Sequence, residues 1–348
     1  MRSVTPDAIA AFAAEVGPPD AGPVAAVGGR TQWGVGRISD APEVREVRAP
    51  AGIVALEAAD MTVRVRAGTT VSELDAALAE VGQTVALPAW DGATVGGVLA
   101  VGHSGLRRLG WGPVRDVLLE ARVVSADGRV VKAGGPTVKN VSGYDLCRLL
   151  VGSLGTLAVT AEVVLRTRPL PPVERWLAGV GDPFALVERL YRPAAVLWDG
   201  TTTWVLLDGH PDDVAAQAAL TDLADVDGPP GLTGLHRWSL RPSELPALEA
   251  SPGLATGRFV VEVGVGIVHA ERPPPPRPVD RHVVALHRRI KAVFDPTGRL
   301  NPDRDPLATT AAAGSGVDPS ANPRSPAPRS VPSERRKPAP GGPTTEPA

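Results

Sequence analysis

The residues of this sequence whose types and spacing could do chemistry begin with a glycine cluster at positions 28–34, directly after the apolar stretch 24–27. Its members are Gly28, Gly29, Arg30, Thr31, Gln32, Trp33 and Gly34. Glycine lets the backbone adopt positive φ and approach closely, so several N–H groups can surround an anion such as a diphosphate. The commoner interpretation of such a segment, taken alone, is a glycine turn after a strand.

This cluster matches neither of two familiar nucleotide-binding motifs. A Walker loop needs Lys-Ser or Lys-Thr after its glycines. A dinucleotide fingerprint needs G-x-G-x-x-G and a later acidic residue for the ribose. Residues 28–34 satisfy neither pattern. A phosphate-bearing ligand therefore remains possible, but a different binding motif would have to hold it.

Two further clusters of small residues follow. The second, GATVGGVLAVGHSG at 92–105, has few large side chains over fourteen positions, which suits a backbone laid against a flat ligand. Its Thr94 and Ser104 offer hydroxyl groups. The third is KNVSGYDL at 139–146, with GSLGT at 152–156. Taken alone, each cluster is more simply explained by a structural role, but the order of the three along the chain is specific.

Hydrophobic periodicity predicts the elements that position these clusters. Residues 60–66 alternate as a strand. Residues 70–82 form an amphipathic helix, which Thr70 and Glu73 open as a capping box and Gly82 ends.

A hairpin comes next. Residues 117–124 and 129–133 flank the turn 125–128, whose sequence is Ser-Ala-Asp-Gly. Residues 157–165 give another strand. The first part of the chain is therefore mixed α+β, with several strands and at least three helices.

Proline-rich breaks divide the chain at 168–175, at 272–280 and from Pro306 onward. The last segment has ten prolines and no aromatic residue, so it cannot bury enough apolar surface to offset the entropy of ordering. We expect a first domain at 1–170 with a return segment at 281–305, a small domain at 171–280, and a disordered tail at 306–348.

Composition narrows the class of protein. The formal net charge of −2 gives no electrostatic reason to expect nucleic acid. The single cysteine, Cys147, excludes an internal disulfide, a cysteine zinc cage and an iron–sulfur cluster within this chain. No run of eighteen apolar residues occurs, and the first residues do not form a secretory leader. We therefore expect a cytoplasmic protein.

In this order the clusters resemble the FAD-binding domain of the vanillyl-alcohol oxidase family, and more closely the E subunits of bacterial glycolate oxidases. The likeness is strong over 24–170 and 285–304, roughly half of the chain. The segments that carry it, besides 28–34, are SGLRR at 104–108, GPVRD at 112–116, KNVSGYDL at 139–146, GSLG at 152–155 and DPTGRLNP at 295–302.

This resemblance implies a two-subdomain α+β FAD-binding module of the PCMH type under a small, reduced α+β cap. Covalent flavin in the family uses His or Cys, which the first loop lacks and the second offers only as His103, so non-covalent FAD is expected. The residues that would bind it are Gly28, Gly29, Arg30, Thr31, Gln32, Trp33, Gly34, Thr94, Val95, Gly96, Gly97, Ser104, Gly105, Asn140, Gly143, Tyr144, Gly155, Leu157 and Asn301.

The catalytic residue is unknown from the sequence. Family caps carry substrate-binding residues and usually the base, but here the cap is short. Its residues 259–270 alternate as one strand that ends near His269. His269 is a weak candidate for the base, and an ordinary strand-end histidine is the commoner interpretation. His282 and His287 are five residues apart, unlike a helical zinc pair, so we predict no metal.

The resemblance further implies a subunit of a complex that oxidises a small 2-hydroxy acid, glycolate to glyoxylate, by hydride transfer to flavin. Its partners would be a homologous FAD subunit and an iron–sulfur subunit, and they could hold it at the inner face of the membrane. Two alternatives stay open: a stand-alone FAD dehydrogenase or oxidase of another alcohol or 2-hydroxy acid, and a non-catalytic subunit that holds FAD for assembly. A cell-wall flavin reductase on the same fold is disfavoured, because no nicotinamide fingerprint is present.

Overall fold

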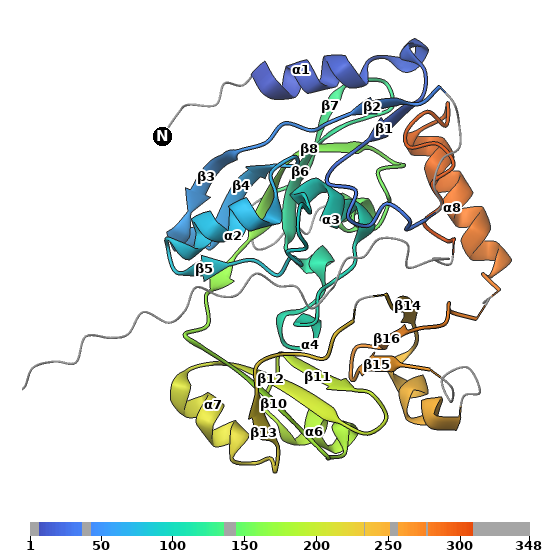
Figure 1. Ribbon diagram of the computed structural model, residues 1–348. Coiled ribbons are helices and arrows are strands. Elements are labelled where there is room, and N and C mark those ends of the chain that lie inside the picture. Colours follow the sequence, from blue (N-terminus) through green and yellow to red (C-terminus); the bar gives the residue numbers. More distant parts are fainter. Residues whose placement is uncertain are drawn as a thin grey trace, which may run out of the picture.

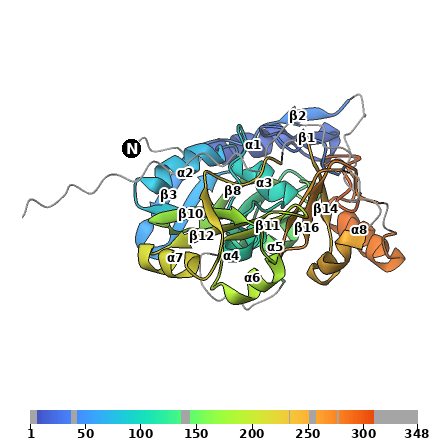
Figure 2. The same cartoon turned by 60° about the horizontal axis from the view of Figure 1, so that its bottom comes forward.

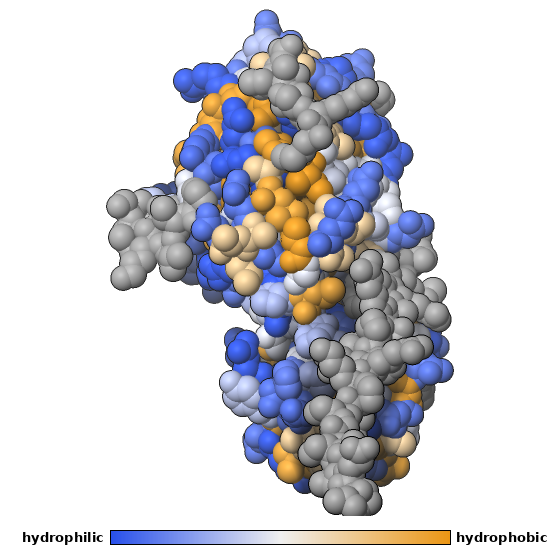
Figure 3. Space-filling view, turned by 90° about the vertical axis from the view of Figure 1, so that its left-hand side faces the viewer, coloured by the Kyte–Doolittle hydropathy of each residue, from blue (hydrophilic) through white to orange (hydrophobic). Residues whose placement is uncertain are grey.

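The computed structural model describes residues 7–36, 43–135, 144–232, 234–250, 257–275 and 278–308. The chain forms an upper and a lower lobe, and the segment after the lower lobe returns to the upper one (Figure 1). Figure 3 shows the two lobes with a narrower waist between them. Residues 309–348, most of the tail that the sequence predicts to be disordered, lie outside the described residues.

The first part of the upper lobe is a small parallel sheet. It pairs β1 (Val24–Ala26) with β2 (Arg45–Val47) and is covered by α1 (Asp7–Val16), with the 3-10 turn η1 (Pro19–Ala21) between α1 and β1. Ile9, Phe12 and Val16 of α1 pack in one cluster with Val24 and Val47. This packing fixes the direction in which the chain leaves β1 and enters the glycine cluster at 28–34.

The second part of the upper lobe is a five-stranded antiparallel sheet in the order β3-β4-β8-β6-β7. Its strands are β3 (Ile53–Glu57), β4 (Thr62–Arg66), β8 (Val159–Arg166), β6 (Leu118–Val124) and β7 (Val130–Gly134). The predicted hairpin at 125–128 joins β6 and β7, with Gly128 at a φ of 81°. The strands expected at 60–66, 117–124, 129–133 and 157–165 are thus confirmed within a few residues.

Short helices cover this sheet. They are η2 (Ala58–Asp60), α2 (Val71–Ala79), α3 (Val95–Val101), α4 (Arg108–Trp111), η3 (Val114–Asp116) and α5 (Leu146–Leu150), and the small pair β5 (Gln83–Thr84) and β9 (Arg168–Pro169) closes one edge. The predicted capping box opens α2, because the Thr70 hydroxyl accepts from Glu73 N at 3.2 Å and Glu73 accepts from Thr70 N at 2.9 Å. Thr94 caps α3 in the same way, by accepting from Gly97 N at 3.2 Å.

The lower lobe is built on a seven-stranded sheet in the order β13-β10-β12-β11-β15-β16-β14. Its strands are β13 (Ala224–Val226), β10 (Val173–Gly179), β12 (Thr203–Gly209), β11 (Ala195–Trp198), β15 (Phe259–Glu262), β16 (Ile267–Ala270) and β14 (His236–Ser239). The domain limits expected at 170/171 and 280/281 remain predictions, although β10 begins just after β9 ends.

One expectation for this lobe was wrong. Residues 259–270 form two strands, β15 and β16, that pair in a hairpin, and not one strand. The turn between them contains Gly264 at a φ of 78° and Gly266 at a φ of 86°. These are left-handed values that favour glycine, so the two glycines of the stretch reverse the chain.

The two faces of the lower sheet have different neighbours. Helices α6 (Pro183–Arg189) and α7 (Pro211–Ala218), with η4 (Pro242–Ala250), pack on one face, where Leu186, Val214 and Leu245 join its buried cluster. Figure 2 shows α6 and α7 on the same side of the sheet. The other face has its own cluster, against which Leu106 of the upper lobe packs.

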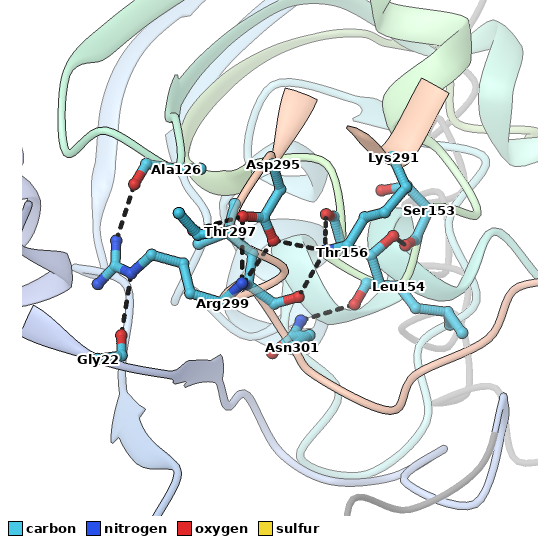
Figure 4. A network of polar contacts seen from close by, with 11 residues as sticks. Gly22, Ala126, Ser153, Leu154, Thr156, Lys291, Asp295, Thr297, Arg299 and Asn301 are labelled. Atoms are coloured by element: carbon cyan, nitrogen blue, oxygen red, sulfur yellow. Dashed lines mark hydrogen bonds and ion pairs between the residues drawn. The ribbon is translucent and has the colours of Figure 1, made fainter. Parts of the chain in front are cut away.

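The return segment binds the end of the described chain into the upper lobe (Figure 4). After α8 (Arg281–Phe294), the buried Arg299 donates to the carbonyl oxygens of Gly22 at 2.9 Å and Ala126 at 3.0 Å. The Asp295 carboxylate accepts from the backbone N–H groups of Arg299 and Leu300 at 3.1 and 2.8 Å. Residues distant in sequence therefore meet because the DPTGRLNP segment satisfies buried backbone groups of the N-terminal part.

Candidate cofactor site

An open cavity of about 1000 Å³, part of it open to solvent, lies in the upper lobe. Its walls come from six stretches that are separate in sequence and are mostly made of small residues. The lining residues are Ala26–Trp33, Val35, Ala49, Ala67, Gly68, Thr94, Gly96–Val98, Ala100, Val101, Leu150, Ser153–Gly155, Ala158–Thr160, Asn301 and Arg304. The glycine clusters of the sequence thus meet around one cavity.

The first glycine cluster is pressed against the second. A Cβ atom on Gly29 would lie 1.7 Å from the carbonyl oxygen of Gly92, and one on Gly28 would lie 2.2 Å from the Thr94 hydroxyl. Gly28 and Gly29 do not have positive φ, so their role is close approach of two backbone segments and not a left-handed turn. This contact brings the main chain of both clusters to the cavity wall.

Cationic and aromatic side chains gather at the same loop. Arg304 donates to the carbonyl oxygens of Trp33 at 2.6 Å and Val35 at 2.8 Å, and its guanidinium lies 4.1 Å from the centre of the Trp33 ring. Arg30 lies over the same ring at 5.1 Å. Burial lowers the pKa of Arg304. Arg30 is ion-paired with Glu46, so Arg304 supplies the positive charge at this loop that a diphosphate would need.

Asn301 ties the return segment to the cavity. Its side-chain oxygen accepts from Ala26 N at 2.8 Å, and its side-chain nitrogen donates to Leu154 O at 2.6 Å. Gly155 accommodates this amide, since a Cβ there would lie 2.3 Å from the Asn301 nitrogen. Asn301 therefore locks two cavity walls together through a residue of the DPTGRLNP segment.

Gln32 supplies an unmatched polar atom in the cavity wall. Its Oε1 atom is buried and has no hydrogen-bond partner in the described part of the chain, while its Nε2 atom lies 3.3 Å from Nδ1 of His103. A buried acceptor without a partner is costly and calls for a donor from a ligand. Together with the glycine contacts and the cations, Gln32 fits a cavity built for an elongated polar cofactor with a flat ring.

The predicted site residues divide into three groups. Lining the cavity are Gly28, Gly29, Arg30, Thr31, Gln32, Trp33, Thr94, Gly96, Gly97, Gly155 and Asn301. Described but outside this lining are Gly34, Val95, Ser104, Gly105, Tyr144 and Leu157. Asn140 and Gly143 lie outside the described residues. All of these assignments stay predictions.

Three of the residues outside the lining have other surroundings in the fold. The Ser104 hydroxyl accepts from Val114 N at 3.1 Å, so it holds the turn before η3. Val95 is fully buried in the main cluster of the upper lobe. Tyr144 is 96% exposed. Small or aromatic residue types within a motif do not reveal which of their neighbours they contact.

Arg304, Ser153 and Thr160 line the cavity but were not predicted. Arg304 follows the closing N-P pair by two positions, and its cationic side chain was the one available signal. Ser153 and Thr160 carry no signal beyond their place next to the third glycine cluster. Their position depends on how α5 and β8 meet.

His269, the weak candidate for a base, is buried and lies within hydrogen-bond distance of Glu262, with Nε2 and Oε1 2.8 Å apart. It lines neither the cofactor cavity nor a second cavity, which lies between the lobes and is lined by His103 and Arg237. Cys147 is also buried, and burial raises the pKa of its thiol to about 11. This environment is unsuited to a reactive thiolate.

Comparisons with known proteins agree with this geometry. A family described as "FAD binding domain" matches residues 9–134, and one described as "FAD linked oxidases, C-terminal domain" matches residues 262–304. The glycolate oxidase subunit GlcE of Escherichia coli (strain K12) is 36% identical over 193 residues, which are 53% of this chain and 55% of that protein. A D-lactate dehydrogenase of Archaeoglobus fulgidus is 42% identical over 123 residues, which are 35% of this chain and 27% of that protein.

Among solved structures, an alkyldihydroxyacetonephosphate synthase superposes with a TM-score of 0.65 at 14% identity, covering 85% of this chain and 75% of the other. That likeness shows the fold alone, and it confirms the expected α+β class of the PCMH type. Residues 9–134 and 262–304 thus match families of FAD-linked oxidases, and the cofactor is FAD. The chain spans 55% of the length of GlcE and 27% of the D-lactate dehydrogenase.

Within the described residues, every helix is too short or too polar to span a bilayer. No group of three or more His, Cys, Asp or Glu side chains there is arranged to hold a metal ion.

Proposed function

We propose that this chain is the FAD-holding subunit of a glycolate oxidase-like complex that oxidises a small 2-hydroxy acid, with glycolate as the leading substrate. The observation that carries the proposal is the cavity at which three separate glycine segments and Asn301 meet. The similarity to a glycolate oxidase subunit and to D-lactate dehydrogenases supports 2-hydroxy acids as the substrate class.

In this proposal the chain binds FAD mainly through its backbone. The loop 28–34 and Arg304 would hold the diphosphate, and the small residues of α3 would face the flat part of the cofactor. Attachment is non-covalent, because loop 28–34 has no His or Cys and Cys147 is buried away from the cavity. FAD supplies the chemistry of accepting a hydride from the carbon that bears the substrate hydroxyl.

In this proposal the electrons leave the reduced flavin through a partner. This chain has one cysteine and so cannot hold an iron–sulfur cluster of its own. We therefore propose a homologous FAD subunit and an iron–sulfur subunit as partners. We place the complex in the cytoplasm, where proteins usually lack disulfides. Oxidation of glycolate to glyoxylate releases two electrons and two protons, which the partner relay and solvent would take up.

The exposed apolar side of helix α8 supports the proposal of a partner subunit. It has no buried residue, and Val283, Leu286 and Val293 on its apolar side are 41%, 50% and 76% exposed. A stripe of this kind on a helix is typical of a surface that another protein covers. We assign it to the homologous FAD subunit.

The first experiment is purification and a flavin spectrum. The chain should retain FAD or take it up with an absorbance change, and a colourless chain without affinity for added FAD would end the proposal. Affinity capture from the native host should then recover a larger FAD subunit and a cysteine-rich subunit. The variant Leu286→Asp should lower capture of the FAD subunit about tenfold or more while FAD retention stays intact. Val180→Asp, at an apolar residue of the lower lobe that is 90% exposed, is the matched control.

A second candidate is a subunit that only holds FAD for assembly. It is favoured by one observation: His269 is bonded to Glu262 and lines neither cavity. Anaerobic addition of glycolate to the captured complex separates the two functions, because the flavin bound to this chain should bleach if this chain oxidises substrate. A variant complex in which only the partner holds FAD provides the reference spectrum.

A further inference from the structure

A second cavity lies between the two lobes, directly beside the cofactor cavity. It holds about 910 Å³, part of it open to solvent, and it shares Val35, Val101 and Leu154 with the cofactor cavity. The upper lobe contributes His103, and the lower lobe contributes Arg237 to Leu240 around the end of β14. A molecule in this second cavity would therefore adjoin the cofactor.

Arg237 is the exceptional side chain of this cavity. It is half-buried, and its guanidinium makes no hydrogen bond or ion pair with any residue that the structure describes. Guanidinium carries five N–H donors, and Arg237 lines the cavity, where an acceptor from a ligand could reach them. Burial and the neighbouring charge of Arg108 both disfavour its cation and lower its pKa, whereas Glu262 opposes that effect.

Glu262 does not satisfy Arg237 directly. Arg237 on β14 stands opposite His269 on β16, and His269 lies 2.8 Å from the Glu262 carboxylate. The carboxylate is thus engaged by the imidazole and acts on Arg237 only through its charge. What the guanidinium lacks is an oxyanion within hydrogen-bond reach.

His103 faces the same cavity from the upper lobe. Gln32 Nε2 donates to its Nδ1 at 3.3 Å, so the neutral ring carries its proton on Nε2. Burial, with the charges of Arg237 and His269, lowers the pKa of His103 to about 3. His103 is therefore a neutral hydrogen-bond donor.

We propose that Arg237 and His103 bind the carboxylate of a small 2-hydroxy or 2-oxo acid in the cavity between the lobes. Guanidinium matches a carboxylate with two parallel N–H donors, and the imidazole N–H supplies a third. The inference rests on the proposed function for its substrate class, but it places the binding site in this chain and not in a partner. Gln32, which touches His103 and also lines the cofactor cavity, is the positioning residue that links the two sites.

The test uses the full chain loaded with FAD and titrated with oxalate, which is not oxidised, by calorimetry and by the change in flavin absorbance. Oxalate should bind the wild type, and Arg237→Gln should weaken it about 30-fold or more, with Arg237→Lys recovering part of the loss. Glycolamide, a neutral analogue of glycolate, should bind weakly and equally to all variants. Equal oxalate affinity in wild type and Arg237→Gln, or no binding to an FAD-loaded wild type, would overturn the inference.

A matched variant and a stability measurement complete the design. Arg241→Gln removes the same charge four residues further on, at an exposed position outside the cavity, and should leave oxalate binding unchanged. Arg237→Gln should leave the melting temperature nearly unchanged, because the guanidinium has no hydrogen-bond partner among the described residues, whereas loss of a structural arginine would lower it. A chain that binds no FAD contradicts the proposed function instead, and the oxalate titration of that chain still reports on Arg237.

Discussion

The two cavities of this protein are built from different materials. The cofactor cavity is walled by main chain and small residues, and its glycines fit because two backbone segments approach within the space that a Cβ would need. The cavity between the lobes depends on single polar side chains, Arg237 from one lobe and His103 from the other. Backbone packing tolerates little change in volume, whereas isolated charges respond to charge and pH.

The largest effect should come from adding one carbon to the cofactor cavity. The variant Gly29→Ala puts a Cβ 1.7 Å from Gly92 O, and moving this backbone apart should cost about 3 kcal/mol, or about 100-fold in FAD affinity. Flavin bound per chain measures it, with circular dichroism as the check on folding. Gly228→Ala is the matched control, because its Cβ would meet nothing within 4 Å. Normal FAD content in Gly29→Ala would remove the backbone explanation.

A smaller loss of FAD affinity is expected when the hydrogen bonds of Asn301 to the two cavity walls are removed. Asn301→Ala leaves Ala26 N and Leu154 O without partners, which should lower the free energy of unfolding by about 2–4 kcal/mol and FAD affinity about tenfold. Asn301→Asp keeps the acceptor for Ala26 but loses the donor to Leu154, so it should fall between alanine and wild type. Chemical denaturation measures the effect, and equal stability of all three proteins would show that the return segment does not lock the cavity.

The environment of His103 in the cavity between the lobes should make the stability of the protein depend on pH. The pKa of His103 is about 3 in the folded chain, below its ordinary value of 6.5, so between these values the unfolded chain binds a proton that the folded chain does not. Stability should therefore fall as pH drops below about 6.5, and His103→Gln should fall less. Melting temperatures from pH 7 to pH 4 measure this, with His210→Gln at an exposed helix cap as the control. Parallel curves for wild type and His103→Gln would contradict it.

The last effect concerns Asp75 on α2, whose carboxyl group lies near Arg107. Burial raises the pKa of Asp75 to about 7, partly offset by Arg107 and by the hydrogen bond from Thr84. The folded chain thus keeps a proton that the unfolded chain loses above pH 3.8, and stability from this group falls as pH rises from 3.8 to about 7. Asp75→Asn should be more stable than wild type at pH 8 and equal to it near pH 4, whereas the exposed Asp222→Asn should track wild type throughout.

Much of the upper lobe could be predicted because its signals are local. The Thr70–Glu73 capping box, the turn at 125–128 and the alternation of β4 are each complete within a few residues, so propensity and periodicity reveal them. The lower lobe gave weaker signals. There the alternation over 259–270 concealed the turn at Gly264 and Gly266, because glycines within an alternating pattern mark a bend only when their φ values are known.

The site divides in the same way. The order of the glycine clusters and the DPTGRLNP segment predicted FAD, because main-chain binding of a long cofactor requires small residues at several places in the chain. Arg304, Arg237 and His103 could not be singled out as site residues from the sequence, because an arginine or a histidine gives the same signal until its neighbours are known. Their partners lie up to 271 positions away in the case of Arg304 and Trp33.

Residue size and local backbone preference were enough to predict the α+β class and the FAD cofactor, because both leave signals within short stretches of sequence. The side-chain contacts came only from the packed structure: Asn301 bonds to two cavity walls, His269 lies next to Glu262, and Arg237 lines a cavity with His103 and has no hydrogen-bond partner among the described residues. These contacts depend on the distances between side chains of different elements, which are set only when the lobes pack together.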